Sequence, residues 1–160
     1  MKKIIAMLLS VVMLLAGSVT VLAAENPPTE GLVYELDSNS TDVISPRLSY
    51  LTSVFTDLTF TDTGKAICQG NCSIFKPYDG ILTVTLQRSR VNTTDDSSWS
   101  NVFGASWSMA WNTMGTHMIQ EVKNSVAAGY YYRVLTTATV YSNIGTMLET
   151  VVVKSLVYHH

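Results

Sequence analysis

The sequence predicts an all-β fold, an antiparallel sandwich of about seven strands. Three observations support this fold class. After Pro46, apolar and polar residues alternate in short runs, and turn-forming residues separate these runs at intervals of about 8 to 12 residues. Ser, Thr, Val, Leu and aromatic residues, which fit strands, are abundant. No amphipathic helical period occurs after residue 23.

The first residues have the pattern of a secretory signal peptide. Lys2 and Lys3 precede an apolar run from Ile4 to Ala16, and small residues surround a cleavage position after Ala23. The apolar run is too short to span a bilayer comfortably, and no later stretch of about twenty apolar residues follows it. We therefore expect residues 1–23 to be removed on export, leaving a secreted or envelope-associated protein without a membrane span.

The remaining chain divides into a spacer and one domain. Residues 24–45 contain Pro27, Pro28 and several acidic residues but few large apolar side chains, which predicts a flexible acidic spacer. Residues 46–160 suffice for a single domain with one core. Removing the two leader lysines changes the formal net charge from −2 to −4. A chain with so few basic residues lacks the cationic patch of a nucleic-acid-binding protein.

The strands follow from the alternation of apolar and polar residues. Leu82, Val84 and Leu86 share one face of the clearest run, as in a half-buried strand. Gly104 allows a break, so its flanks form one bent strand or two short ones. The expected strands cover residues 49–60, 65–75, 81–90, 99–103, 105–111, 117–122, 130–141 and 146–158. Turn residues lie between them, at 61–64, 76–80, 112–115 and 143–145.

The number of strands and the turn spacing favour an immunoglobulin-like sandwich, with a small closed β-barrel as the alternative. The pattern Ala128-x-Tyr130-x-Tyr132-x-Val134 is similar to the strand of such sandwiches in which a corner tyrosine bonds back to the backbone.

Cys68 and Cys72 lie in the expected strand 65–75. In a continuous strand, residues four apart face the same side at a distance of about 13 Å. A disulfide requires Cα atoms within about 7 Å. We therefore favour two free thiols packed in a sheet face, with a local disulfide across a bulge at Gly70 as the alternative.

Motifs of catalysis and metal binding are missing from the sequence. It contains no G-x-S-x-G elbow, H-E-x-x-H pair or phosphate-binding glycine loop. Cys68, Cys72 and His117 lack the second ligand pair of a zinc site. Asp57, Glu121 and Glu149 lie on expected strands, and we interpret them as exposed side chains rather than a hydrolytic pair. The sequence thus predicts no catalytic residues, no metal and no cofactor.

The aromatic residues are the feature of the sequence that indicates a function, namely binding. Flat rings can stack on sugar faces while Ser, Thr and Asn supply hydrogen bonds, so a binding surface could form from the tryptophans and nearby tyrosines. The favoured alternative is that Trp107, Met109 and Trp111 line the core face of one strand. Tyr131 and Arg133 lie opposite the face of Tyr132, where a partner could meet them. The candidate binding residues are Trp99, Trp107, Trp111, Tyr131 and Arg133.

An ordered set of short motifs resembles a known family. The set comprises Ile44-Ser45-Pro46-Arg47, Gly64-Lys65-Ala66-x-Cys68-x-Gly70, Val84-x-Leu86-Gln87, Ser98-Trp99-Ser100-x-Val102, Tyr132-Arg133-Val134-x-Thr136-Thr137-Ala138 and Glu149-Thr150-Val151. It is similar to the small secreted proteins of Gram-positive gut and soil bacteria classed as a domain of unknown function. The resemblance covers about residues 45–158 and implies export and a β-sandwich, but no activity, ligand or catalytic residue.

These observations together predict a non-catalytic extracellular binding module whose ligand is a glycan or a protein. The alternative is a self-associating structural or envelope protein whose exposed strand edges pair between copies. A small hydrolase has the least support. The sequence leaves the ligand and the oligomeric state open.

Overall fold

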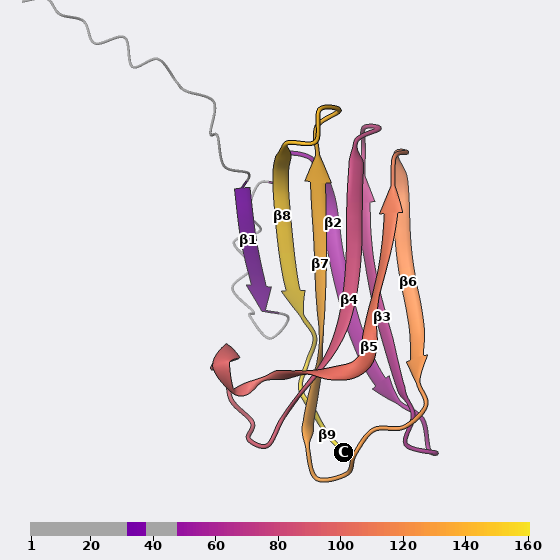
Figure 1. The fold of residues 1–160 in the computed structure, drawn as a ribbon, viewed down its shortest axis with the longest axis vertical. Coiled ribbons are helices and arrows are strands. Elements are labelled where there is room, and N and C mark those ends of the chain that lie inside the picture. Colours follow the sequence, from indigo (N-terminus) through magenta and orange to yellow (C-terminus); the bar gives the residue numbers. More distant parts are fainter. Residues whose placement is uncertain (1–31, 38–47) are drawn as a thin grey trace, which may run out of the picture.

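Two β-sheets packed face to face make up residues 32–37 and 48–160, which are the residues that the computed structural model describes (Figure 1). The strands are β1 (Leu32–Asp37), β2 (Leu51–Phe60), β3 (Ala66–Ile74), β4 (Asp79–Ser89), β5 (Ser100–Trp111), β6 (Gly115–Lys123), β7 (Tyr131–Tyr141), β8 (Met147–Lys154) and β9 (Tyr158–His159). One sheet has the order β1-β8-β7-β4-β5, with β9 paired to β7, and the other has the order β2-β3-β6. The expected signal peptide, residues 1–23, lies outside the described residues.

The connections are those of an immunoglobulin-like sandwich, which confirms the predicted fold class. The chain passes from the hairpin β2–β3 in the small sheet to the hairpin β4–β5 in the large sheet, returns for β6, and crosses again for β7–β8. Neither described sheet closes into a barrel. Tyr132, at the start of β7, is fully buried, and its hydroxyl donates a hydrogen bond to the carbonyl of Ala127 at 2.7 Å. This bond is the tyrosine corner of such sandwiches.

Strand β1 corrects part of the spacer prediction. It lies within residues 24–45 and pairs in parallel with β8, from Leu32 opposite Glu149 to Asp37 opposite Lys154. The prolines and acidic residues of this segment dominate its average composition and conceal the short run Leu-Val-Tyr-Glu-Leu. An edge strand also depends on a neighbour more than a hundred residues away in sequence, which local composition does not reveal.

Strand β5 is one continuous strand with a large bulge rather than two strands. Thr85 pairs with Ser106 and Gln87 pairs with Asn101, so residues 102–105 lie opposite the single residue between Thr85 and Gln87. Gly104 adopts a φ of 64°, which favours glycine. The bulge is held by Lys123, whose Nζ donates to the carbonyl of Phe103 at 2.9 Å.

The core lies between the sheets and is formed by alternate residues of their inner faces. At its centre the hydroxyl of Thr136 on β7 donates to that of Thr56 on β2 at 2.8 Å. Gly70 on β3 fits here because a Cβ atom would lie 2.5 Å from both the Thr136 hydroxyl and a methyl group of Val84. The close approach of the two sheets therefore requires glycine at position 70.

Glu149 is fully buried, which contradicts its interpretation as an exposed side chain. Its carboxylate accepts backbone N–H bonds from Ser49 at 2.8 Å, Tyr50 at 3.0 Å and Leu51 at 2.8 Å. A buried carboxylate without partners is very costly, and three donors compensate its desolvation. The Glu149 side chain, on β8, thus fixes the backbone of residues 49–51, where the chain enters β2.

We expect the Glu149→Ala substitution to lower the free energy of unfolding by about 3 kcal/mol, because three N–H groups, of which that of Leu51 is buried, lose their charged acceptor. Glu149→Gln keeps one acceptor oxygen, so its free energy of unfolding should lie between those of Glu149→Ala and the wild type. Urea unfolding followed by tryptophan fluorescence measures both. Glu121→Ala, at an exposed position, is the control and should change stability by less than about 0.5 kcal/mol. Equal stability of the Glu149 and Glu121 variants would contradict this role.

Cys68 and Cys72 are free thiols that are buried in the core face of β3. Burial raises the pKa of each thiol to about 12, because the thiolate would lose its hydration.

Native protein at pH 8 should therefore react with a thiol reagent such as dithionitrobenzoate much more slowly than protein in urea, which should release two equivalents. Absorbance of the released thionitrobenzoate measures both rates. Rapid labelling of the native state would contradict the burial, and absence of labelling in urea would indicate a disulfide.

Candidate binding site at the β4–β5 loop

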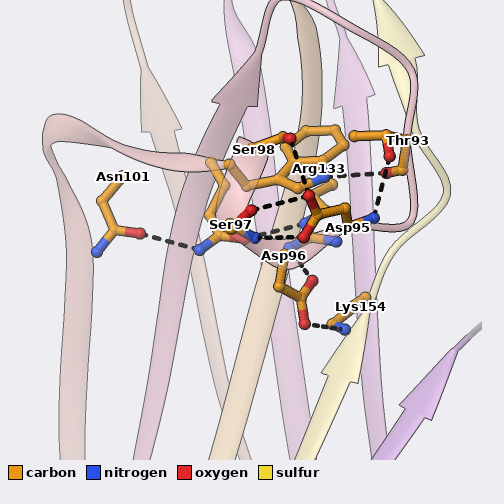
Figure 2. A network of polar contacts seen from close by, with 10 residues as sticks. Thr93, Asp95, Asp96, Ser97, Ser98, Asn101, Arg133 and Lys154 are labelled. Atoms are coloured by element: carbon orange, nitrogen blue, oxygen red, sulfur yellow. Dashed lines mark hydrogen bonds and ion pairs between the residues drawn. The ribbon is translucent and has the colours of Figure 1, made fainter.

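The loop between β4 and β5 is structured by its own short polar side chains (Figure 2). Asp95 precedes a 3₁₀ helix, η1 (Asp96–Ser98), and its carboxylate accepts bonds from the backbone N–H of Ser97 at 3.0 Å and from the Ser97 hydroxyl at 2.8 Å. The Thr93 hydroxyl accepts the N–H of Asp95 at 3.1 Å, and the Thr93 carbonyl accepts the indole N–H of Trp99 at 3.0 Å. These bonds hold the loop in one conformation without a regular sheet or long helix.

Arg133 of β7 lies beneath this loop and is 5% exposed. Its guanidinium carbon lies 4.3 Å from the centre of the Trp99 ring, a cation–π contact. Its Nε donates to Gln87 at 2.9 Å, and its Nη2 donates to one carboxylate oxygen of Asp96 at 2.7 Å. A cation at this depth needs such partners, because burial removes its hydration.

Lys154, at the end of β8, donates from Nζ to the other carboxylate oxygen of Asp96 at 2.8 Å and is 8% exposed. One carboxylate therefore bridges two cations that adjacent strands supply. The hydrogen bond from Lys154 and then that from Arg133 lower the pKa of Asp96 to about 2.

Two hollows flank the loop. The first has a volume of about 700 Å³ and is lined by Asn92, Thr93, Thr94, Arg133, Lys154, Ser155, Leu156, Val157 and Tyr158. The second has a volume of about 450 Å³ and is lined by Arg88, Ser89, Arg90, Val91, Ser98, Ser100 and Tyr130. Four of the seven Lys and Arg residues in the described part of the chain thus line two neighbouring hollows. Positive charge is concentrated here in a chain whose net charge is negative.

The structure brings together only part of the predicted site. Trp99 and Arg133 are in contact, and Tyr131 lies two residues before Arg133, with its ring 4.7 Å from that of His159. Trp107 and Trp111 lie on the core-facing side of β5 instead, opposite Val84 and Gly80. The five candidate residues therefore do not form one surface.

Sequence reasoning missed Asp96 and Lys154 as members of the site. Asp96 was recognisable as part of the most polar loop of the domain, but its partners lie 37 and 58 residues away. Nothing in the spacing of these residues indicates that β7 and β8 place two cations beneath the loop.

Comparison with known proteins adds no assignment: no family model matches the chain, and no curated protein matches it significantly. The resemblance to a secreted bacterial family therefore stays a prediction. Among the described residues, no cluster of three or more His, Cys, Asp or Glu side chains could hold a metal ion. The same part of the chain contains no helix long and apolar enough to cross a membrane.

The low pKa of Asp96 predicts how stability depends on pH. Because the pKa in the folded chain, about 2, lies below the ordinary value of 3.8, the ionised carboxylate stabilises the fold above pH 4. This stabilisation is lost as the pH falls through about 2. We expect the difference in unfolding free energy between wild type and Asp96→Asn to be largest above pH 4 and to shrink toward pH 2. Urea unfolding at a series of pH values measures it, and a constant difference would contradict the ion pairs.

Proposed function

We propose that this chain is a non-catalytic extracellular binding module and that its ligand is a glycan bound in the larger hollow beside the β4–β5 loop. The lining of this hollow supports the proposal. Asn92, Thr93 and Thr94 offer hydroxyl and amide groups to sugar hydroxyls, and Tyr158 offers part of a ring to a sugar face. The leader expected at residues 1–23 would export the protein to where such polymers occur.

The observation that carries the proposal is that the polar groups of the hollow belong to a rigid frame. The cation–π contact between Trp99 and Arg133 holds the loop against β7, and the indole N–H of Trp99 bonds to the Thr93 carbonyl, so little conformational entropy is lost when a ligand binds. Loops positioned by a rigid sandwich are also the usual location of binding residues in such folds.

The acidic groups beside the hollow favour binding over hydrolysis. A glycoside hydrolase needs a carboxylic acid of raised pKa to protonate the leaving group. Hydrogen bonds from Ser97 lower the pKa of Asp95, and those from Lys154 and Arg133 lower the pKa of Asp96. Both groups are therefore poor proton donors near neutral pH.

A second candidate function is self-association through strand edges, and the edge of the large sheet favours it. β5 ends the strand order of that sheet, and residues 97–120 contain no Lys, Arg, Asp or Glu. Charged residues normally discourage pairing at such edges. Self-association predicts a molecular mass that rises with protein concentration in the absence of ligand, as measured by sedimentation equilibrium.

Retention on insoluble polysaccharides and cell-wall sacculi tests the glycan proposal. We expect saturable retention of the wild type. The double variant Asn92→Ala/Thr94→Ala should bind about tenfold or more weakly, because it loses two hydrogen-bonding side chains that line the hollow. Asn143→Ala, an exposed residue in the β7–β8 turn, is the matched control and should bind normally.

Absence of retention on every polysaccharide would contradict the proposal and favour a protein ligand or self-association. Equal retention of the double variant and the wild type would place the binding surface elsewhere.

A further inference from the structure

The geometry points to a carboxylate-binding site formed by Arg133 and Lys154, which the side chain of Asp96 occupies in the free protein. We infer that the ligand is an acidic glycan whose uronate carboxylate displaces Asp96. This inference rests on the proposed glycan-binding function and deepens it.

The two cations form the fixed part of the site. Arg133 and Lys154 are nearly buried and come from neighbouring strands, and each donates to a different oxygen of one carboxylate, at 2.7 and 2.8 Å. Two donors facing the two oxygens of a carboxylate recognise that group by charge and by shape. Both cations also line the larger hollow, so a ligand in the hollow lies beside them.

The Asp96 carboxylate is the exchangeable part. Its side chain is 52% exposed, in contrast to 6% for Arg133 and 11% for Lys154. The conformation of the loop depends on other groups: Asp95 caps η1, and the indole of Trp99 is bonded to the Thr93 carbonyl. Rotation of the Asp96 side chain into solvent would therefore break its own bonds to Arg133 and Lys154 while these loop bonds remain.

Exchange of one carboxylate for another avoids the main energetic cost of opening this site. Removing the partner of a buried cation strongly destabilises a protein, because the remaining charge has lost its hydration. A uronate that takes the place of Asp96 supplies both cations with a carboxylate again, and its sugar hydroxyls can bond to Thr93 or Thr94 in the hollow. Arg88 and Arg90, in the second hollow, could meet further carboxylates of a polymer. The hydroxyl-rich lining favours a sugar over an acidic peptide.

The displacement makes a prediction that a matched control separates from the general effect of removing one negative charge. If the Asp96 side chain leaves the cations in about a tenth of the molecules or fewer, it lowers the apparent affinity about tenfold or more. Asp96→Ala should therefore bind oligogalacturonate about tenfold more tightly than the wild type. Asp95→Asn is the matched control, because it removes the same charge from the same loop, touches neither cation and keeps a good helix-capping side chain.

The experiment titrates each protein with oligogalacturonate, a neutral galacto-oligosaccharide and polyglutamate, following tryptophan fluorescence and calorimetric heat. Circular dichroism checks that each variant folds, and Asp96→Ser replaces Asp96→Ala if the alanine variant unfolds. Lys154→Met should lose oligogalacturonate binding. Tighter binding by the Asp96 variant than by Asp95→Asn, with loss in Lys154→Met, is the expected result.

The other outcomes separate this inference from the proposed function. Oligogalacturonate binding that is equal in the Asp96 and Asp95 variants would overturn the displacement, but glycan binding would stand. Binding of the neutral sugar alone would also overturn the displacement and leave glycan binding standing. Binding of polyglutamate without oligogalacturonate would overturn the glycan assignment. Absence of binding by every protein to all three probes would overturn the carboxylate site, whereas the glycan proposal falls only if retention on every polysaccharide is also absent.

Discussion

The carboxylate of Glu149 lies between the sheets and accepts hydrogen bonds from three successive N–H groups where the chain enters β2. A fully buried carboxylate is tolerated only where its hydration is replaced. The arrangement therefore fixes β2 relative to β8, and with it the stacking of the small sheet on the large one. The backbone of β8 also pairs with β7 on one side and with β1 on the other. One strand thus links three other strands.

Strand β8 also connects the Glu149 contact to the opposite end of the sandwich. β8 begins near Glu149 and ends at Lys154, beside the β4–β5 loop (Figure 1). Because β7 and β8 are in fixed register, Arg133 and Lys154 lie where one carboxylate can meet both. The core determines where the cations lie, and the loop determines what neutralises them. This division allows a stable scaffold to present a site whose occupant can change.

The regular parts of the fold were predictable because their signals are local. Alternation in 81–90 and 130–141 predicted β4 and β7, and the tyrosine pattern around Tyr132 predicted a corner whose hydrogen bond the structure contains. The turn residues between these runs predicted where the hairpins turn. These features depend on neighbours a few residues away, for which sequence patterns carry information.

The parts that the sequence did not reveal depend on distant partners. Glu149 has the same chemistry whether it faces water or three N–H groups, and those groups lie about a hundred residues away. The convergence of Arg133 and Lys154 on Asp96 likewise needs the register of β7 and β8 and the path of the loop. For the tryptophans, period-2 alternation allowed both a core face and a binding surface, and only the packing of β5 places Trp107 and Trp111 toward the core.

The most direct test of a carboxylate-binding site at Arg133 and Lys154 is to locate the ligand by nuclear magnetic resonance, with an oligogalacturonate titrated into the ¹⁵N-labelled wild type. Because Trp99 and Arg133 adjoin the carboxylate site, we expect the largest shifts for the Trp99 indole N–H, the Arg133 Nε–H and the amides of residues 92–98 and 154–158. Largest shifts near Trp107 and Trp111, or no shifts at saturating oligosaccharide, would contradict this site.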